Sequence, residues 1–490
     1  MTDVPYEEWR ARADGLAPHT GHHVYGAFLD GPVTSPVVAP RDGRTIAHVP
    51  SAGTAEVDAA VTAARRAFDT GPWPRLAPAE RKAALLRWAD LVERDRETLA
   101  LLVSLEMGKP ITDSYGIELR ALINCLRWYA EAADKQLDEA PRGSASSLAL
   151  VTREPVGVVA AVVPWNFPLT MAAWKIAPAL ATGCTVVLKP AEESPLSALH
   201  LAALSAEAGL PPGVFNVVNG PGEVAGRALG EHPDVDVLAF TGSTEVGRHF
   251  LRYAASSNLK RVWLELGGKS PNIILPDAPD LDAAADTAAW GIFFNAGEMC
   301  TAPSRLLVHR SVAGRVLDRI VARAESLRVG DPLDPATEMG PLVSATHHAR
   351  VMEHIEAART SGARLRAGAR ADGPFIAPTV FDQVEPGMRV AREEIFGPVL
   401  AVLEFDDPGE AVALANDTDY GLAAAVWTSD LSTAHRVSRA LKAGTVWVNC
   451  YEEGDMSVPF GGVKQSGHGR DKSLHALDKY TDLKTTWIEL

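Results

Sequence analysis

Residues 156–189, VGVVAAVVPWNFPLTMAAWKIAPALATGCTVVLK, contain the pattern that decides the fold. The run 156–163 is short and continuously apolar, which predicts a strand buried on both faces. The segment 169–180 predicts a helix that ends at Gly183, and 185–189 predicts a second buried strand. A strand, a helix and a strand in this order predict one unit of a parallel sheet.

The same alternation continues to residue 266. The expected helices are 194–208, 223–229 and 243–255, and the expected strands are 214–218, 235–240 and 261–266. This order predicts an α/β fold whose parallel sheet is covered on both faces. Such sheets bind ligands beyond the carboxyl ends of their strands. Asn166, Lys189, Gly242 and Glu265 all lie at these ends, so we expect them to share one site.

A second α/β block and two flanking elements complete the organisation. Its expected helices are 281–296, 313–327, 409–416 and 432–442, and its expected strands are 305–308, 399–405, 424–428 and 445–449. Upstream, amphipathic helices at 54–67, 79–101 and 115–137 predict a scaffold. The polar stretch 141–149 and a strand at 151–154 predict a projecting hairpin. The alternating tail 480–490, YTDLKTTWIEL, predicts a strand that joins a sheet across a subunit boundary.

Composition narrows the functional class. The chain has 490 residues, too many for one core, and a net charge of -15, from 47 basic and 62 acidic residues. This charge argues against a nucleic-acid or anionic-membrane partner. The absence of a long apolar run predicts no membrane span, and the polar beginning, MTDVPYEEWR, predicts no secretory leader. Four scattered cysteines without metal-ligand spacing predict free thiols, no metal and a cytoplasmic location.

Cys300 is the candidate nucleophile, in the stretch FNAGEMCTAPSR at 294–305. A buried cysteine is by default an inert apolar residue, and we expect this of Cys125, Cys184 and Cys450. Cys300 differs because glycine, threonine and alanine around it leave room for a substrate to reach the sulfur. Its thiolate would need an electropositive surround, which a nicotinamide ring would supply.

Two polar residues are candidate partners of this thiol. Asn166, between prolines, could cap the following helix or donate to a developing oxyanion. Glu265 could be a solvated surface charge, but it ends an apolar strand, and a carboxylate in a cleft can act as a general base for water. Gly267 and Gly268 follow it and predict a close backbone approach to a cofactor or substrate.

The turn FTGSTEVG at 240–247 is a candidate phosphate site. An ordinary strand–helix turn looks similar, but here a strand precedes a helix N-terminus whose free N–H groups can meet phosphate. Lys189 and Glu192, after another strand, suit ribose hydroxyls. Because the carboxylate of Glu192 would repel a 2′-phosphate, we expect NAD rather than NADP.

Several motifs in order resemble one family. They are PWNFP (164–168), KPAE (189–192), FTGS (240–243), ELGGKS (265–270), GEMC (297–300), EEIFGP (393–398), PFGG (459–462) and KQSG (464–467). Over nearly its full length the chain resembles the NAD(P)-dependent, non-CoA-acylating aldehyde dehydrogenases. The stretches 453–462, EGDMSVPFGG, and 469–475, GRDKSLH, resemble the γ-glutamyl-γ-aminobutyraldehyde dehydrogenases of bacterial putrescine breakdown.

The resemblance implies two Rossmann-like parallel-sheet domains and a β oligomerisation hairpin. Residues 1–133 and 156–265 would form the NAD-binding domain, and 266–470 the catalytic domain. Residues 134–155 and 471–490 would form the oligomerisation element of a homodimer or homotetramer.

The resemblance also implies a mechanism. Cys300 would attack a small-molecule aldehyde, Asn166 and the Cys300 N–H would stabilise the oxyanion, and Glu265, tuned by Lys175, would activate water to hydrolyse the thioester. The cofactor-binding residues would be Val163, Pro164, Trp165, Lys189, Glu192, Gly222, Phe240, Gly242, Ser243, Leu266, Glu394 and Phe396. The substrate pocket would be formed by Phe167, Trp174 and Phe460.

Two departures and the choice of substrate stay open. Glu298 stands where the family usually has Gln, and we expect it to point away from the sulfur or to pair with a cation. Pro303 is also unusual and is expected to stiffen the loop. The acidic residues Glu452, Glu453 and Asp455 could attract an aminoaldehyde or form a solvated surface. The alternatives are a broad-specificity aldehyde dehydrogenase, a CoA-acylating relative, which Glu265 disfavours, and a non-catalytic relative.

Overall fold

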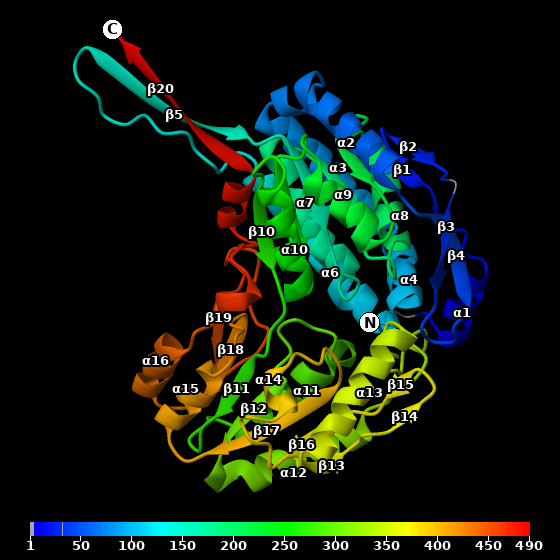
Figure 1. The fold of residues 1–490 in the computed structure, drawn as a ribbon, viewed down its shortest axis with the longest axis vertical. Helices are drawn as coiled ribbons and strands as arrows, with labels where there is room; N and C mark the ends of the chain where they lie inside the picture. Colours follow the sequence, from blue (N-terminus) through cyan, green and yellow to red (C-terminus); the bar gives the residue numbers. More distant parts are fainter. Residues whose placement is uncertain (1–3, 32) are drawn as a thin grey trace.

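Two seven-stranded sheets, each in its own α/β domain, organise the chain (Figure 1). The computed structural model describes residues 4–31 and 33–490. Residues 1–3 lie outside the described residues. They begin the polar N-terminal segment for which the sequence predicts no secretory leader. Among the described residues, no helix is long and apolar enough to cross a membrane. The predicted α/β class with two mainly parallel sheets is confirmed.

The first sheet carries the predicted alternation. In spatial order its strands are β10 (Arg261–Glu265), β9 (Val237–Thr241), β6 (Val158–Val162), β7 (Thr185–Lys189), β8 (Phe215–Val217), β1 (His22–Val24) and β2 (Ala27–Leu29). The first five are parallel, and β1 and β2 are antiparallel. The chain moves outward from β6 through β7 and β8, then returns to β9 on the other side of β6. Ligands bind where strand order reverses in this way.

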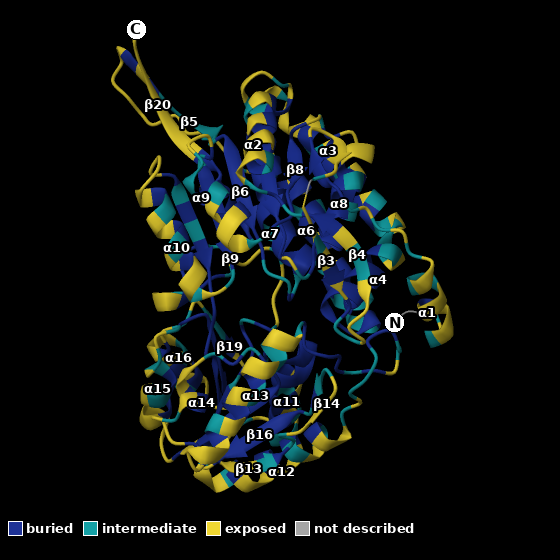
Figure 2. Cartoon of the chain, turned by 45° about the vertical axis from the view of Figure 1, so that its right-hand side comes forward, coloured by how far each residue is buried: buried dark blue, intermediate teal, exposed yellow. Residues whose placement is uncertain are grey.

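Helices cover both faces of this sheet because successive side chains of a strand point to opposite sides. Val159 and Ala161 of β6 belong to the larger core, and Val158 and Ala160 to a second core on the other face. The helices on the first face are α3 (Pro78–Arg94), α4 (Arg96–Met107), α6 (Leu119–Ala132), α7 (Pro168–Thr182) and α8 (Leu196–Glu207). Those on the second face are α2 (Thr54–Asp69), α9 (Arg227–Glu231) and α10 (Thr244–Ala255). The inner strands of both sheets are dark blue, that is, buried, in Figure 2, whereas the edge strands β2 and β13 are largely exposed.

The second sheet builds the other domain, which lies below the first in Figure 1. In spatial order its strands are β13 (Arg364–Ala367), β16 (Thr379–Asp382), β17 (Val399–Phe405), β12 (Arg305–His309), β11 (Pro271–Ile274), β18 (Ala423–Trp427) and β19 (Thr445–Val448). Only β13 is antiparallel. Its helices are α11 (Leu281–Phe293), α12 (Arg310–Ser326), α13 (Ala345–Thr360), α14 (Arg389–Arg392), α15 (Pro408–Asn416) and α16 (Leu431–Ala440).

A two-stranded arm projects from the body. The C-terminal strand β20 (Thr481–Glu489) pairs along its whole length with β5 (Ser147–Pro155) of the same chain. The tail was expected to have little to pair with in its own domain, and this part of the expectation is wrong, because the two strands lie far apart in the sequence. The expectation that the tail joins a sheet across a subunit boundary stays a prediction. The arm carries the C-terminus away from both domains (Figure 1).

Two long helices predicted from periodicity are interrupted. The expected helix 79–101 is α3 followed by α4, which meet at Asp95 in a non-helical conformation. The expected helix 115–137 begins as a wide turn at Ser114–Glu118 and ends at Ala132. The break at Asp95 contains neither Pro nor Gly, whereas Gly116 lies within the wide turn. The apolar periodicity continues across both breaks, so it predicted one helix in each case. Helix α13 and strands β11, β13 and β16 were not predicted.

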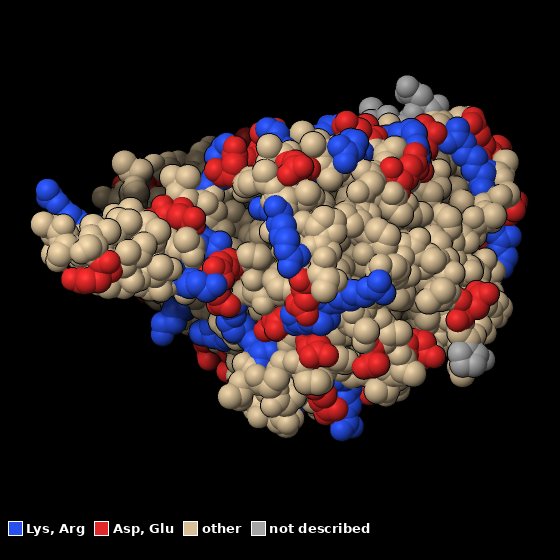
Figure 3. Space-filling view, turned by 90° about the horizontal axis from the view of Figure 1, so that it is seen from above, with Lys and Arg blue, Asp and Glu red and all other residues tan. Residues whose placement is uncertain are grey.

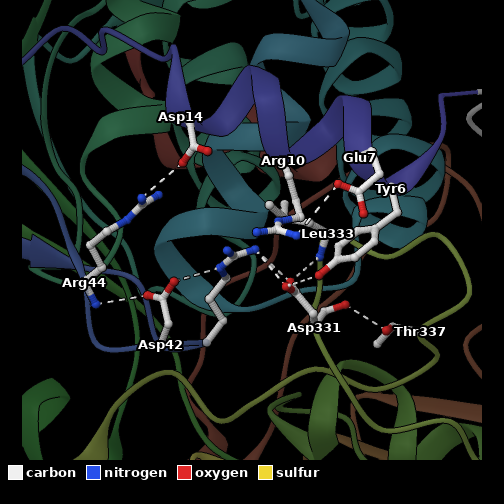
Figure 4. Close-up of polar contacts among 10 residues, drawn as sticks. Tyr6, Glu7, Arg10, Asp14, Asp42, Arg44, Asp331, Leu333 and Thr337 are labelled. Carbon is white, nitrogen blue, oxygen red and sulfur yellow. Dashed lines mark hydrogen bonds and ion pairs between the residues drawn. The ribbon is translucent and has the colours of Figure 1, made fainter.

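The N-terminal helix α1 (Tyr6–Asp14) is tied to the second domain (Figure 4). Tyr6 Oη donates to Asp331 Oδ2 at 2.9 Å, and Arg41 Nη1 lies 2.9 Å from both oxygens of the same carboxylate. The C-terminal segment also crosses back to the first sheet, where Leu266 N donates to Ser466 O at 3.0 Å. These contacts fix the two domains against each other on both sides of the site.

Candidate active site

The loop that carries Cys300 has an unusual backbone. After α11 the residues Asn295, Ala296 and Gly297 have φ values of 51°, 55° and 71°. Such values are strained for residues with a side chain and often mark functional sites. A Cβ on Gly297 would lie 2.2 Å from Gly397 O, so only glycine permits this approach. The loop therefore presents Cys300 from a backbone fixed by neighbouring segments.

Asn166 meets this loop from the other domain. It follows β6, is buried, and donates from Nδ2 to Glu298 O at 3.0 Å. Asn295 Nδ2 in turn donates to Asn166 O at 3.2 Å and to Glu298 O at 3.1 Å. A carboxamide has two N–H donors, so Asn166 keeps one for a ligand. The alternative that Asn166 caps the next helix is wrong, because α7 begins without a side-chain cap.

Cys300 and Asn166 line one cavity of about 540 Å³ between the domains. Of the predicted residues, the cavity is also lined by Pro164, Trp165, Phe167, Gly242, Ser243, Leu266, Glu394 and Phe396. A second groove of about 630 Å³ shares Glu193, Val343 and Ser344 with it and extends past Glu192. Together the two hollows form an elongated cleft at the reversal point of the first sheet.

Glu265 lies beside the cavity rather than in its lining. It ends β10, is 5% exposed, and neither carboxylate oxygen has a hydrogen-bond partner among the described residues. Burial raises the pKa of Glu265 well above its ordinary value, and Asp471 raises it further, whereas Lys175 and Lys479 lower it. A Cβ on Gly461 would lie 2.6 Å from Glu265 Oε1, so the carboxylate faces the C-terminal segment. A buried carboxylate without partners is available to accept a proton.

The protein groups around Cys300 are acidic, so the electropositive surround expected from a nicotinamide ring does not come from the protein itself. Burial raises the pKa of the Cys300 thiol, and the carboxylates of Glu452, Glu394 and Glu265 raise it further. The protein alone therefore keeps this sulfur protonated. The positive charge that would favour the thiolate has to come from a ligand, and a base has to remove the proton.

The two glycines after Glu265 approach protein groups closely, and Gly267 also lines the cavity. A Cβ on Gly267 would lie 2.0 Å from Glu394 Oε2, and one on Gly268 would lie 2.4 Å from Cys300 O. Gly268 N also donates to Glu394 Oε1 at 2.9 Å. The predicted close approach is present, but its partners are the carboxylate of Glu394 and the backbone of the nucleophile.

The residues predicted for the ribose lie together at the carboxyl ends of β7 and β8. Gly222 N donates to Glu192 Oε1 at 2.6 Å, and Lys189 Nζ lies 3.6 Å from Glu192 Oε2. Lys189 is buried and also donates to Pro190 O at 3.0 Å. A cation and a carboxylate thus stand at the edge of the groove beside Glu193.

Some of the residues predicted for a phosphate site lie at the start of α10, and others lie in the core. Ser243 caps α10, its hydroxyl accepting from Val246 N at 3.3 Å, and the first N–H groups of the helix face the same end. Phe240 lies in the core with its ring against Phe250, 4.9 Å between centroids, and directly under Gly242. Val163 is buried too. Neither Phe240 nor Val163 lines the cavity, so any contact with a ligand would come from neighbouring residues.

The predicted aromatic residues form separate pairs. Trp174 and Phe460 face each other at 5.2 Å between ring centroids, and Phe167 lies 6.2 Å from Phe294. Lys472 Nζ lies 5.9 Å from the Trp174 ring centre. Trp165 meets Phe396 edge-on at 5.4 Å. Trp165, Phe167 and Phe396 line the cavity that holds Cys300, whereas Trp174 and Phe460 are not among its lining residues.

The two departures from the family pattern are buried. Glu298 is fully buried, and its Oε1 accepts from Val343 N at 3.0 Å. His347 Nε2 lies 3.7 Å from Glu298 Oε1. Burial raises the pKa of Glu298 well above its ordinary value and lowers the pKa of His347 to about 4. The pair is therefore neutral, so the expected pairing with a cation is not found among the described residues. Glu298 is also not among the residues that line the cavity with Cys300. A Cβ on Gly291 would lie 2.8 Å from Pro303 Cγ, so Pro303 packs tightly on α11, as expected of a stiffened loop.

Sequence reasoning missed two groups at this site. Val343, Ser344, Thr346, His347 and Arg350 line the cavity from the start of α13. Ser344 accepts from His347 N at 3.2 Å, and a serine before a helical segment could have located this helix. Asp471 and Lys479 stand behind Glu265, and only their place in the fold reveals this.

A thiol and a carboxamide thus line a cleft between two α/β domains, and a buried carboxylate without a hydrogen-bond partner among the described residues lies beside it. The chain belongs to the aldehyde dehydrogenase family, whose model matches residues 30–486. It therefore acts on aldehydes as an oxidoreductase, and the family resemblance found in the sequence is confirmed.

Three relatives illustrate the similarity. Aminoacetaldehyde dehydrogenase of Pseudomonas aeruginosa is 52% identical over 488 residues, which cover 99% of this chain and 98% of that protein. The crystal structure of γ-glutamyl-γ-aminobutyraldehyde dehydrogenase from Burkholderia cenocepacia is 56% identical, with a TM-score of 0.98 over 99% of this chain and 100% of that one. The Pseudomonas syringae indole-3-acetaldehyde dehydrogenase AldA, solved with NAD+, is 53% identical, with the same TM-score and coverage.

Proposed function

We propose that the chain oxidises an aldehyde to its carboxylic acid with NAD, through a covalent intermediate on Cys300. The observation that carries this proposal is that Cys300 and Asn166, from different domains, line one cleft, with Glu265 beside it. The alternative of a non-catalytic relative is disfavoured, because burying a carboxylate without partners is costly unless it has a use.

The cleft fits a dinucleotide by its donor set. The N-terminus of α10, capped by Ser243, offers N–H groups for a phosphate, and Lys189 with Glu192 offers a cation and an acceptor for ribose hydroxyls. Glu394 and Phe396 line the part of the cavity that also holds Cys300. A bound nicotinamide dinucleotide would supply the hydride acceptor that the oxidation requires. The carboxylate of Glu192 favours NAD over NADP, whose extra phosphate it would repel.

The residues of the chain would act in two stages. In the first, the Cys300 thiol gives up its proton and the sulfur bonds to the aldehyde carbon, while the free N–H of Asn166 and the N–H of Cys300 stabilise the oxyanion. Oxidation leaves a thioester on Cys300. In the second, Glu265 takes a proton from water, whose oxygen attacks the thioester carbon. The carbon–sulfur bond breaks, the acid leaves and Cys300 recovers its proton.

Two variants test this assignment. Cys300→Ala should abolish NADH production from aldehyde while NAD still binds, as measured by fluorescence titration. Glu265→Gln should accumulate an acyl-enzyme that intact-protein mass spectrometry detects. Aldehyde oxidation by Cys300→Ala at the wild-type rate would refute the nucleophile, and wild-type turnover of Glu265→Gln without an adduct would refute the base.

The substrate we propose is an aminoaldehyde or an N-acylated aminoaldehyde. Two of the three named relatives carry the names of such substrates, aminoacetaldehyde and γ-glutamyl-γ-aminobutyraldehyde, whereas the third is named for indole-3-acetaldehyde. Glu452 is half-buried instead of fully solvated, and its charge acts on Cys300. Burial raises the pKa of Glu452 to about 7, and Lys472 opposes this rise. Glu453 and Asp455 are exposed. The choice between an aminoaldehyde and a broad range of aldehydes is tested by measuring kcat/KM for a panel of aldehydes with NAD and with NADP. If aminoaldehydes have a lower kcat/KM than hexanal, the aminoaldehyde proposal fails and the broad-specificity alternative stands.

The arm is the proposed oligomerisation element. Its strands leave Leu483, Trp487 and Leu490 61%, 63% and 77% exposed, and an isolated two-stranded ribbon is marginally stable in water. Seen from above, the arm is mostly free of charged side chains (Figure 3). We infer that it packs on another copy of the chain in a homodimer or homotetramer. Deletion of residues 481–490 should lower the mass measured by light scattering, and an unchanged mass would refute this.

A further inference from the structure

The first turn of α7 has no cap from its own residues. The helix begins at Pro168, which has no N–H, and Phe167 before it provides no side-chain cap. The N–H groups of Leu169 and Thr170 have no partner within the helix, and both residues are buried. Glu118 Oε1 accepts from these two N–H groups at 3.0 and 2.8 Å. One carboxylate oxygen from another part of the chain therefore caps α7.

Glu118 is itself held by a buried lysine. It closes the wide turn at Ser114–Glu118, and such turns are frequent at functional sites. Lys109, in the loop after α4, donates from Nζ to Glu118 Oε2 at 2.5 Å, and both side chains are at most 1% exposed. Burial lowers the pKa of Lys109 and the carboxyl group of Glu118 opposes this change, but the hydrogen bond is made whichever of the two groups holds the proton. One oxygen of Glu118 thus serves α7 and the other serves Lys109.

The same lysine contacts the wall of the cavity. Lys109 Nζ lies 3.7 Å from the centre of the Phe167 ring, within the range of a cation–π contact. Phe167 lines the cavity with Cys300, and its ring lies 6.2 Å from the ring of Phe294. Neither Lys109 nor Glu118 is among the residues that line the cavity. The pair therefore contacts this wall from behind.

Asn166 is held from two sides. On the side of the nucleophile loop, it donates to Glu298 O at 3.0 Å, and its backbone oxygen accepts from Asn295 Nδ2 at 3.2 Å. On the other side, only two residues separate it from the backbone that Glu118 holds, and the second is a proline with a fixed φ. A shift in the first turn of α7 would therefore move Asn166 against the nucleophile loop.

We propose that Glu118, held by Lys109, is a positioning residue for oxyanion stabilisation: it fixes the first turn of α7 and thereby the direction of the free N–H of Asn166. This proposal rests on the proposed role of Asn166 as an oxyanion donor. If Glu118 had only a structural role, its replacement would lower stability without acting through Asn166. A kinetic measurement separates the two roles.

The test is a double-mutant cycle between positions 118 and 166. Glu118→Gln keeps the shape of the side chain, but only one of its two terminal atoms can accept a hydrogen bond, so it cannot serve both α7 and Lys109. The measured quantity is the single-turnover rate of NADH formation with saturating NAD and aldehyde. This rate should fall about tenfold or more, since a misplacement of about 1 Å can cost about 10²-fold. In the Asn166→Ala background the same substitution should change the rate by less than about twofold, because the group that it positions is gone.

Lys109→Met tests the pair from its other member. It removes the contacts of Nζ with Glu118 and with the Phe167 ring, so it should lower the rate, with a smaller loss in the Asn166→Ala background. An equal loss in both backgrounds would overturn the role of Lys109 in holding Glu118. Circular dichroism and thermal unfolding show which variants fold. If Glu118→Gln does not fold, Glu118→Asp, which keeps the carboxylate but withdraws it by one methylene, gives the measurement.

A second buried carboxylate provides the matched control. Glu106 caps α8 in the same way: its Oε2 accepts from Leu196 N at 2.7 Å and its Oε1 accepts from Ser197 N at 3.2 Å. It is fully buried as well. Glu106→Gln should keep the single-turnover rate within about twofold of the wild type, because α8 carries no residue that contacts the oxyanion. A loss equal to that of Glu118→Gln would show that any buried helix cap affects the rate, and it would overturn the proposal.

The outcomes are distinct. A loss of rate in Glu118→Gln that disappears in the Asn166→Ala background supports the proposal. A folded Glu118→Gln enzyme with the wild-type rate, or the same loss in both backgrounds, overturns it. If Asn166→Ala lowers the rate and Glu118→Gln is not coupled to it, only the role of Glu118 fails. If Asn166→Ala alone keeps the wild-type rate, the proposed function of Asn166 fails first.

Discussion

The contact between Gly268 and the nucleophile loop gives a quantitative prediction. A Cβ at position 268 would lie 2.4 Å from Cys300 O, about 1 Å inside ordinary van der Waals contact. Gly268 cannot move back freely, because its N–H donates to Glu394 Oε1 at 2.9 Å. Gly268→Ala should therefore displace Cys300 by roughly 1 Å, and a misplacement of this size lowers kcat/KM by about 10²-fold.

The assay is steady-state NADH production, with thermal unfolding measured in parallel. Gly314→Ala is the matched control, because Gly314 is exposed within α12 and a Cβ there would meet nothing within 4 Å. This control should keep kcat/KM and gain up to about 1 kcal/mol of stability, since alanine favours a helix over glycine. A folded Gly268→Ala enzyme with kcat/KM within a few-fold of the wild type would refute the reasoning.

Two further substitutions probe the polar groups of the site. Asn166→Ala should lower kcat by about 10²–10³-fold through loss of an oxyanion donor, while Cys300 still reacts with iodoacetamide; a loss below tenfold would assign the oxyanion to other donors. Burial raises the pKa of Glu298 in the folded protein. Between the ordinary glutamate pKa and this raised value, Glu298 is therefore protonated in the folded protein and ionised in the unfolded chain. Stability should fall as the pH rises from the ordinary glutamate range towards that raised pKa. Glu298→Gln, which has no proton to lose, should remove this slope in thermal unfolding and unfold at a higher temperature at neutral pH.

Local sequence pattern was sufficient to predict the first sheet and some of the residues of the candidate site. The apolar strands from β6 to β10 and the helices between them were predictable because each is encoded by its own residues. The convergence of Asn166 with Glu265 followed from one rule about the carboxyl ends of parallel strands. The chemistry of Cys300 could be proposed from the small residues around it. These features need only short segments and the general topology.

The remaining features depend on contacts between distant residues. The pairing of β20 with β5 joins segments more than three hundred residues apart, and no local pattern distinguishes it from pairing across subunits. The interruption at Asp95 lies between two helices that both contribute to the larger core. The acidic surround of Cys300 and the contacts of Lys175 and Lys479 with Asp471 arise from side chains that only the packed domains bring together. The electrostatic environment of a buried site depends on which charged side chains the fold brings together, and a local sequence pattern does not show this.

Backbone contacts, rather than side chains alone, set the distance between the catalytic groups. Gly297 lies against the carbonyl of Gly397, and Gly268 lies against the carbonyl of Cys300. The first contact is made within the second domain, whereas the second joins its nucleophile loop to the segment that follows Glu265. Because a backbone cannot change rotamer, the spacing of thiol and carboxylate is fixed by how these segments pack. The proposed chemistry of Cys300 and Glu265 would therefore depend on these glycines too, since a residue with a Cβ would not allow the segments to approach this closely.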